Sequence, residues 1–352
     1  MKRIYDFLRF WPAATRAAFS SASLIPVLLG SAIAAHDGYF NPWILMLSAV
    51  GVLSLHLGAN LVNDYYDFTS GADVARDSRT PFYGGGTILV QGILTPQQVR
   101  QAYRLLFLTA FIVGLVLAMA RGIGVLAFGL AGFLGGYFYT APPLQLSYKE
   151  LGEATIGLCF GPLTIAGAYL AQTGTITIET IVASIPVGLL VAAIVLVNEF
   201  PDRGADCAAG KRTLAVGLPL HMAFLLYAAL VLMPFPIIGA AILFKILPHT
   251  GIATFIALPL AIYALRQLRL TYFGPATQRI CALSDDHHDT QSAREDACVI
   301  GQDAPALCHQ NPQVAFRRGI SPDSRQVAAS IATILLHFTV GVLLSISHTW
   351  RI

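Results

Sequence analysis

Runs of about 20 consecutive apolar residues recur along this chain, and an α-helix needs this length to cross the hydrocarbon core of a bilayer. Only 12% of the 352 residues are charged, whereas soluble domains carry about 25%. The sequence therefore predicts an all-α integral membrane protein embedded in a lipid bilayer. Its formal net charge of +3 is too small to indicate a nucleic-acid partner.

Nine apolar segments are long enough to be transmembrane helices. They contain scattered prolines and glycines, which membrane helices tolerate because neighbouring helices satisfy the freed backbone groups. The predicted spans are residues 17–35, 43–62, 99–119, 122–141, 151–172, 179–200, 219–242, 250–270 and 326–347.

A long polar stretch separates the eighth predicted span from the ninth. It has mixed charges and few large apolar side chains, so it is expected to be a partly disordered loop. Its cysteines and histidines match no tight zinc-binding spacing. The chain is thus divided into a helical core at residues 1–270, a cytoplasmic loop at residues 271–325, and a ninth helix with the C-terminus at residues 326–352.

Lysine and arginine are distributed unevenly between the two sides of the predicted bundle. Of the 22 basic residues, all except Arg121, Lys245 and Arg351 fall on the side of the N-terminus. Cytoplasmic connections of membrane proteins are enriched in basic residues. The N-terminus is therefore predicted to face the cytoplasm, with the protein in the inner or plasma membrane of the cell.

Two carboxylate-bearing motifs follow apolar segments on that same side. Each motif has three residues at positions i, i+4 and i+8, and the first two of these share one face of a helix. Buried carboxylates are costly in so apolar a protein unless they bind something positive. The residues are Asn63, Asp67 and Gly71 in NLVNDYYDFTSGAD, and Asn198, Asp202 and Asp206 in NEFPDRGADCAAGKR.

The motifs combine hard oxygen donors with nearby basic side chains. Carboxylate oxygens suit Mg²⁺, which proteins usually hold through a few carboxylates together with the phosphate oxygens of a substrate. Arginine or lysine follows the carboxylates of each motif by a few residues. Together with the apolar spans, these features predict a site for a magnesium diphosphate that carries an apolar tail. The basic residues are Arg76, Arg79, Lys211 and Arg212.

The two motifs resemble those of the UbiA superfamily of intramembrane prenyltransferases. The family's first motif, N-D-x-x-D-x-x-x-[D/G], is matched from Asn63 to Gly71, and its second, D-x-x-x-D, from Asp202 to Asp206. The YTAPP run from Tyr139 and the GKRTLAVGL run from Gly210 are also similar to the family. The resemblance covers residues 10–270. It implies a UbiA-like prenyltransferase core, in which a helical bundle surrounds a central polar cavity on the cytoplasmic side.

Within the superfamily, NDYYDFTSGAD and residues 198–218 are most similar to the 1,4-dihydroxy-2-naphthoate prenyltransferases of menaquinone synthesis. This similarity implies transfer of a polyprenyl group from polyprenyl diphosphate to 1,4-dihydroxy-2-naphthoate, giving demethylmenaquinol. The same chemistry on another aromatic acceptor, such as 4-hydroxybenzoate or homogentisate, stays open.

The resemblance also implies roles for particular residues. Mg²⁺ would act as Lewis acid and template for the leaving diphosphate, with Asp67 and Asp202 as catalytic residues. The aromatic face of Tyr139 would stabilise the allylic cation by cation–π attraction. The implied metal ligands are Asn63, Asp67, Asp202 and Asp206, and the implied diphosphate-binding residues are Arg76, Arg79, Asn198, Lys211 and Arg212.

A membrane transporter is the alternative from another functional class, because carboxylates in membrane segments also mark ion pathways. Transport sites lie near the midplane of the bilayer, whereas the two acidic motifs here lie at one side. Release of diphosphate that depends on magnesium would distinguish the enzyme from a transporter.

Overall fold

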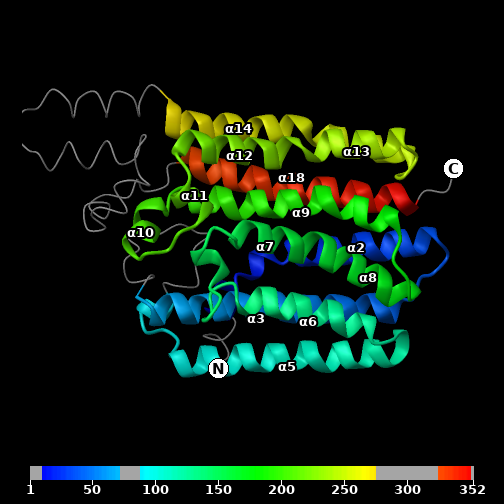
Figure 1. Ribbon diagram of the computed structural model, residues 1–352, viewed down its shortest axis with the longest axis horizontal. Helices are drawn as coiled ribbons and strands as arrows, with labels where there is room; N and C mark the ends of the chain where they lie inside the picture. The colour runs from blue at the N-terminus through cyan, green and yellow to red at the C-terminus, as the bar shows by residue number, and fades with distance from the viewer. Residues whose placement is uncertain (1–9, 72–87, 275–323, 350–352) are drawn as a thin grey trace, which may run out of the picture.

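The computed structural model describes residues 10–71, 88–274 and 324–349. These residues form a bundle of long, roughly parallel helices (Figure 1), and none of them belongs to a β-strand. The predicted all-α membrane fold is confirmed. The elements are η1 (Ala17–Phe19), α2 (Ser21–His36), α3 (Pro42–Thr69), α5 (Pro96–Arg121), α6 (Gly124–Tyr137), η2 (Leu146–Tyr148), α7 (Gly152–Leu158), the π-helical η3 (Cys159–Leu163), α8 (Thr164–Thr173), α9 (Ile178–Glu199), α10 (Arg203–Ala208), α11 (Leu214–Gly217), α12 (Leu220–Leu232), α13 (Pro234–Leu243), η4 (His249–Ala257), α14 (Leu258–Phe273) and α18 (Ser324–Thr349).

Among the described residues, eight helical segments are long and apolar enough to cross a membrane. The predicted count of nine is not confirmed, because the fourth predicted span, residues 122–141, contains only the 14-residue helix α6. The chain leaves this helix before Pro142 and Pro143, whose rings remove the backbone donors that a continuing helix requires. The predicted loop at residues 271–325 falls almost entirely outside the described residues.

Local sequence signals explain where the helices next to the functional site begin. The Asn41 side chain accepts hydrogen bonds from the backbone N–H groups of Trp43 and Ile44 at the start of α3, which satisfies two otherwise unpaired donors. Thr95 and Gln98 form a capping box at the start of α5. Proline follows both cap residues, where its fixed φ suits the first helical turn.

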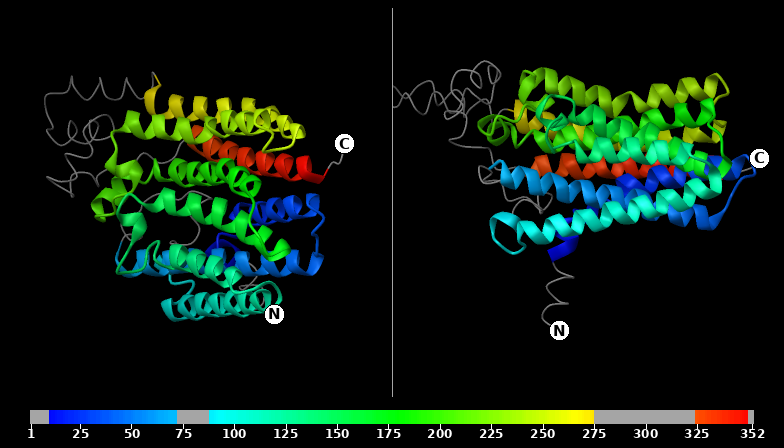
Figure 2. Two further views of the ribbon diagram at one scale, coloured as in Figure 1. Left: turned by 45° about the vertical axis from the view of Figure 1, so that its right-hand side comes forward. Right: turned by 60° about the horizontal axis from the view of Figure 1, so that its bottom comes forward.

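The helices lie in layers across the bundle. Helices α3, α5 and α6 lie at one edge and α12, α13 and α14 at the other, with α2, α9 and α18 between them (Figures 1 and 2). The largest buried cluster joins the central helices to the second edge, through Leu29, Leu190, Tyr227, Leu268 and Leu336. This packed half supports α9, whose C-terminal end carries the second acidic motif.

Small residues let α9 approach the preceding helices closely. A Cβ atom at Gly188 of α9 would lie 2.6 Å from the backbone oxygen of Gly157 in α7. At Gly161 in η3, a Cβ atom would lie 2.7 Å from the Cα atom of Gly188. Membrane helices use such glycines to pack backbone against backbone. The contact fixes the position of α9 beside α7 and η3.

Candidate active site

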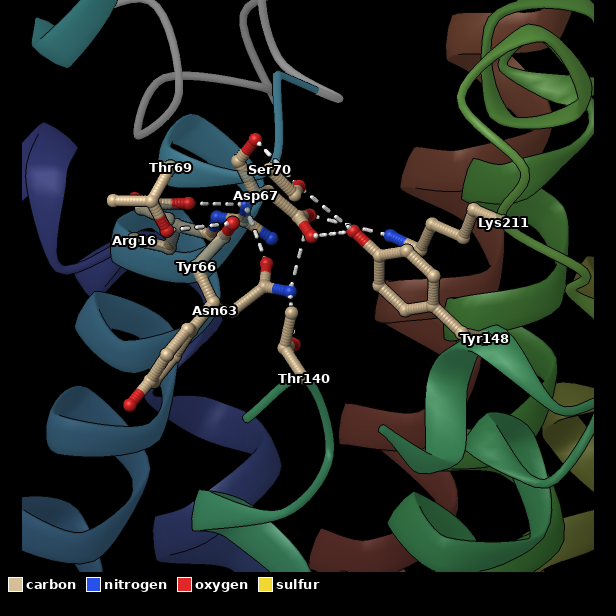
Figure 3. A network of polar contacts seen from close by, with 10 residues as sticks. Arg16, Asn63, Tyr66, Asp67, Thr69, Ser70, Thr140, Tyr148 and Lys211 are labelled. Carbon is tan, nitrogen blue, oxygen red and sulfur yellow. Dashed lines mark hydrogen bonds and ion pairs between the residues drawn. The ribbon is translucent and has the colours of Figure 1, made fainter. Parts of the chain in front are cut away.

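A network of polar side chains occupies the end of the bundle where α3 ends and where α9 leads into α10 (Figures 1 and 3). The carboxylate of Asp67 is its centre and is almost completely buried. It accepts hydrogen bonds from the hydroxyl of Tyr148 at 2.9 Å, the amine of Lys211 at 3.3 Å and the amide of Asn63 at 3.3 Å. The network therefore joins the two acidic motifs, which are far apart in the sequence.

Asn63 lies one helical turn before Asp67 on the same face of α3. Its amide nitrogen also donates to the hydroxyl of Thr140 at 2.6 Å, and its amide oxygen accepts from Arg16 at 3.2 Å. Arg16 pairs in addition with the buried carboxylate of Asp64 at 2.7 Å. The neighbouring carboxylates Asp64 and Asp67 thus have different basic partners.

The second motif folds into a tight turn around the short helix α10. The side chains of Asp202 and Asp206 are both buried, and the backbone N–H of Asp206 donates to the carbonyl of Asp202 at 2.8 Å. Gly210 then adopts a φ of +71°, a left-handed conformation that favours glycine. The turn brings the backbone N–H of Lys211 to within 2.8 Å of the carbonyl of Asp206.

A cavity of about 290 Å³ extends from this polar end into the bundle. Its mostly apolar walls come from α3, α5, α6, α7, η3, α8 and α9. Asp67 is not among the lining residues, although it contacts both Asn63 and Lys211, which are. The predicted site residues that line the cavity are Asn63, Tyr139, Asn198, Asp202, Asp206 and Lys211.

Arg212 lies outside the cavity, although the sequence predicted it beside Lys211 in the diphosphate site. Its guanidinium pairs with Glu150 at 2.9 Å, and its side chain is 56% exposed. Arg212 also forms an isolated β-bridge with Lys149. Successive side chains of an extended segment point in opposite directions, so Arg212 faces away from Lys211. Arg76 and Arg79 lie outside the described residues.

Sequence reasoning missed several side chains that complete the site. Arg16 and Glu199 line the cavity, and the ring centroid of Tyr148 lies 5.5 Å from the amine of Lys211, within range of a cation–π contact. Burial, followed by the charge of Asp67, raises the pKa of Tyr148 to about 12. Tyr148 is therefore a neutral hydrogen-bond donor at physiological pH. Its position in a loop far from both motifs gave no signal in the sequence.

The chemistry of the donors fits Mg²⁺ together with a phosphate-bearing ligand. Among the described residues, no three His, Cys, Asp or Glu side chains are placed to hold a metal ion by themselves. The amide of Asn63 and the carboxylates of Asp67, Asp202 and Asp206 supply hard oxygen donors around the polar end of the cavity. Proteins often complete the coordination of Mg²⁺ with phosphate oxygens of the substrate. A Mg²⁺ ion at this site would therefore need oxygen ligands from a phosphate-bearing substrate in addition to these side chains.

Comparison with known proteins gives concordant similarities. The model of the UbiA prenyltransferase family matches residues 23–280. UbiA prenyltransferase domain-containing protein 1 of Rattus norvegicus is 34% identical over 275 residues, covering 75% of this chain and 76% of the relative. The 1,4-dihydroxy-2-naphthoate octaprenyltransferase of Bacillus subtilis (strain 168) is 31% identical over 202 residues, covering 57% of this chain and 63% of the relative.

Solved structures with the same fold are more distant in sequence. The structure of a UbiA homolog from Archaeoglobus fulgidus bound to GPP and Mg²⁺ is similar with a TM-score of 0.52 at 14% identity. That similarity covers 95% of this chain and 99% of the homolog.

Proposed function

The chain belongs to the UbiA prenyltransferase family, and we propose that it transfers a polyprenyl group from a polyprenyl diphosphate to an aromatic acceptor, with Mg²⁺ as cofactor. The observation that carries this proposal is the meeting of two acidic motifs at the polar end of a largely apolar cavity. Polar and apolar parts of one cavity match a charged head and an apolar tail on one substrate. Membership of an enzyme family favours catalysis over the transport alternative.

The proposed metal ligands are Asn63, Asp67, Asp202 and Asp206. When bound, Mg²⁺ would neutralise the charge that develops on the departing diphosphate. An archaeal homolog with the same fold has been solved with GPP and Mg²⁺, which supports this combination of ligand and ion. Asp67 and Asp202 are the proposed catalytic residues, one from each motif.

Lys211 is the basic residue best placed to hold the diphosphate. It lines the cavity and is 6% exposed, and its amine lies between Asp67 and the ring of Tyr148. Charge-assisted hydrogen bonds from this amine would bind outer diphosphate oxygens. Asn198 lines the same end of the cavity and is proposed to contribute its amide, with Arg76 and Arg79 as further diphosphate ligands.

Tyr139 is proposed to stabilise the allylic cation that remains after the diphosphate departs. It lines the cavity near the polar end, where its electron-rich ring attracts a cation in a site of low dielectric. The apolar walls around it exclude water, which protects the cation from hydrolysis. The electron-rich ring of the acceptor then attacks the cation and forms the new carbon–carbon bond. The ring regains its aromaticity by losing a proton or, for a dihydroxynaphthoate, by losing its carboxyl group as CO₂, while the diphosphate leaves with the electron pair of the broken carbon–oxygen bond.

The proposed acceptor is 1,4-dihydroxy-2-naphthoate, giving demethylmenaquinol. Support comes from the motif similarity and from the Bacillus subtilis relative that prenylates this compound. Arg16 lines the cavity beside Asn63 and provides a cation for the carboxylate of an aromatic acid. Another aromatic acid would satisfy the same contact, so the acceptor is to be determined by product analysis.

The test uses purified protein in lipid with Mg²⁺, a prenyl diphosphate and dihydroxynaphthoate. Asp202→Asn retains the shape of the side chain but removes its charge, and it is expected to lower kcat/KM at least about a hundredfold. Asp37→Asn is the matched control, because Asp37 follows α2 at the opposite end of the bundle and accepts a hydrogen bond from Tyr169.

Diphosphate release and product mass are measured for both variants. Equal loss of activity in Asp202→Asn and Asp37→Asn would contradict the proposed site. If the protein prenylates another aromatic acid but not dihydroxynaphthoate, the proposed site still stands and the proposed acceptor is wrong.

A further inference from the structure

A histidine lies in the wall of the cavity, deeper in the bundle than the acidic motifs. His56 precedes Asn63 by seven residues on α3, so the two side chains share one face of the helix and lie about 10 Å apart along its axis. Both line the cavity, and among the described residues that line it His56 is the only histidine. The imidazole is therefore separate from the proposed metal ligands but opens into the same space.

One ring nitrogen of His56 is held by the protein, and the other is not. Nδ1 is hydrogen-bonded to the hydroxyl of Ser23 on α2. The ring also packs edge-on against Phe160 of η3, with the two ring centroids 4.9 Å apart. No described residue hydrogen-bonds to Nε2, and this atom is not fully buried. The imidazole is thus fixed in orientation, with Nε2 available to a molecule in the cavity.

A cation suited to a carboxylate lies near His56. The guanidinium of Arg16 interacts electrostatically with the imidazole and donates to Asn63 at 3.2 Å. Asn60, one helical turn after His56, donates to the backbone carbonyl of Thr15 at 2.9 Å. This hydrogen bond holds the segment that carries Arg16 against α3. The basic side chain and the imidazole are therefore fixed relative to each other.

Apolar surfaces complete this part of the cavity. Phe19 of η1, Ala22 of α2 and Phe160 of η3 line it together with Arg16 and His56. An aromatic hydroxy acid needs a cation for its carboxylate, apolar surface for its ring and a hydrogen-bond partner for its hydroxyl group. The side chains around His56 supply all three.

We propose that His56 is the general base that takes the hydroxyl proton of the aromatic acceptor; the inference rests on the proposed function. With the ring proton on Nδ1, where it is donated to Ser23, the lone pair is on Nε2 and can accept a proton. The carboxylate of the acceptor lies at Arg16. Removal of the hydroxyl proton makes the ring a stronger nucleophile toward the allylic cation.

The proton transfer balances with the bonds formed and broken. The O–H bond of the acceptor breaks, its proton moves to Nε2, and its electron pair enters the ring as the adjacent ring carbon bonds to the allylic carbon. For a dihydroxynaphthoate, that ring carbon then loses its carboxyl group as CO₂. The electron pair of this bond restores the aromatic ring and returns a negative charge to the oxygen, which takes the proton back from Nε2.

The carboxylates that line the cavity are less suited to this role. Glu199, Asp202 and Asp206 lie at its polar end, where Mg²⁺ and the diphosphate of the donor would engage or cover them. His56 lies about two helical turns deeper and remains accessible when the donor is bound.

The first test compares His56→Gln with the unmodified protein in lipid, with Mg²⁺, a prenyl diphosphate and dihydroxynaphthoate. Glutamine can still hydrogen-bond to Ser23, but its amide does not act as a base. The value of kcat is expected to fall about a hundredfold, with KM for the prenyl diphosphate changed by about twofold at most. His221→Gln is the matched control, because His221 is exposed on α12, and it is expected to leave kcat unchanged.

Acceptors with fluorine on the ring distinguish a base from a histidine that only shapes the cavity. Fluorine makes the hydroxyl more acidic, so its proton leaves more easily without a base. The loss of kcat in His56→Gln is therefore expected to shrink from about a hundredfold to about tenfold with a fluorinated acceptor. An equal loss with both acceptors would overturn the proposed base.

Ser23→Ala tests the same proposal with a smaller change, should His56→Gln fail to fold. It removes the partner of Nδ1 and is expected to lower kcat about fivefold to tenfold, because the tautomer and the ring orientation are no longer fixed. Full activity of His56→Gln, or of Ser23→Ala, would overturn this inference while the prenyltransferase stands. Absence of diphosphate release by the unmodified protein with every acceptor would overturn the proposed function itself.

Discussion

At the scale of single residues, the two ion pairs made by Arg16 and Arg212 differ in burial. The side chains of Arg16 and Asp64 are 24% and 3% exposed, whereas those of Arg212 and Glu150 are 56% and 34% exposed. Removing one member of a buried pair leaves an uncompensated charge. Exposed pairs contribute little, because water and salt screen them.

Arg16→Ala is therefore expected to lower the free energy of unfolding by about 3 kcal/mol. Arg212→Ala is expected to lower it by about 1 kcal/mol at most. Denaturant titration of the protein in mixed micelles measures both changes. The double variant Arg16→Ala/Asp64→Ala is expected to recover part of the loss, and a double variant less stable than Arg16→Ala would contradict the unpaired-charge explanation.

The acidic residues could be predicted from the sequence because both motifs repeat one helical spacing after an apolar span. Three side chains that contact Asn63, Asp64 or Asp67 could not be predicted. Tyr148 and Thr140 lie in the loop between α6 and α7, and Arg16 precedes η1, so no periodicity connects them to the motifs. Lys211 and Arg212 are adjacent and chemically similar, so the sequence does not show that only Lys211 lines the cavity. The extended backbone at Arg212 directs its side chain away from the cavity and toward Glu150.

At the scale of helices, apolar length predicted the long spans well, since hydrocarbon thickness sets that length. The shortness of α6 was not predicted, because hydropathy continues through Phe138 while the helix ends at Tyr137. The contact between α7, η3 and α9 was also not predicted. It depends on which glycines of two distant segments face each other, and a single sequence does not contain this information.

That contact leads to a prediction for Gly188. An alanine there would place its Cβ atom 2.6 Å from the backbone oxygen of Gly157, so α7 and α9 must separate. Gly188→Ala is expected to lower the free energy of unfolding by about 1–3 kcal/mol. Gly239→Ala is the control, because a Cβ atom at Gly239 meets only the ring of Phe255, at 3.5 Å. Equal stability of the two variants in denaturant titration would contradict the close contact.

At the scale of the whole molecule, the polar site lies at one end of an otherwise apolar bundle. Asn63 and Asp67 at the end of α3 and Asp202 at the end of α9 lie at that end, together with the start of α5. The connection between α2 and α3 lies at the opposite end (Figure 1). The enrichment of basic residues on the side of the acidic motifs leads us to propose that the active site faces the cytoplasm.

This orientation is testable with single cysteines in a variant that lacks the native ones. Tyr39→Cys places a thiol in the connection between α2 and α3, where Tyr39 is 57% exposed. Gln97→Cys places one at the exposed start of α5, at the other end of the bundle. A maleimide that cannot cross membranes is expected to label Tyr39→Cys in intact cells, but Gln97→Cys only after permeabilisation. The reverse labelling pattern would place the active site on the outer side of the membrane. Tyr39 and Gln97 lie at opposite ends of the helical bundle, so only the opposite orientation of the bundle in the membrane would give that pattern.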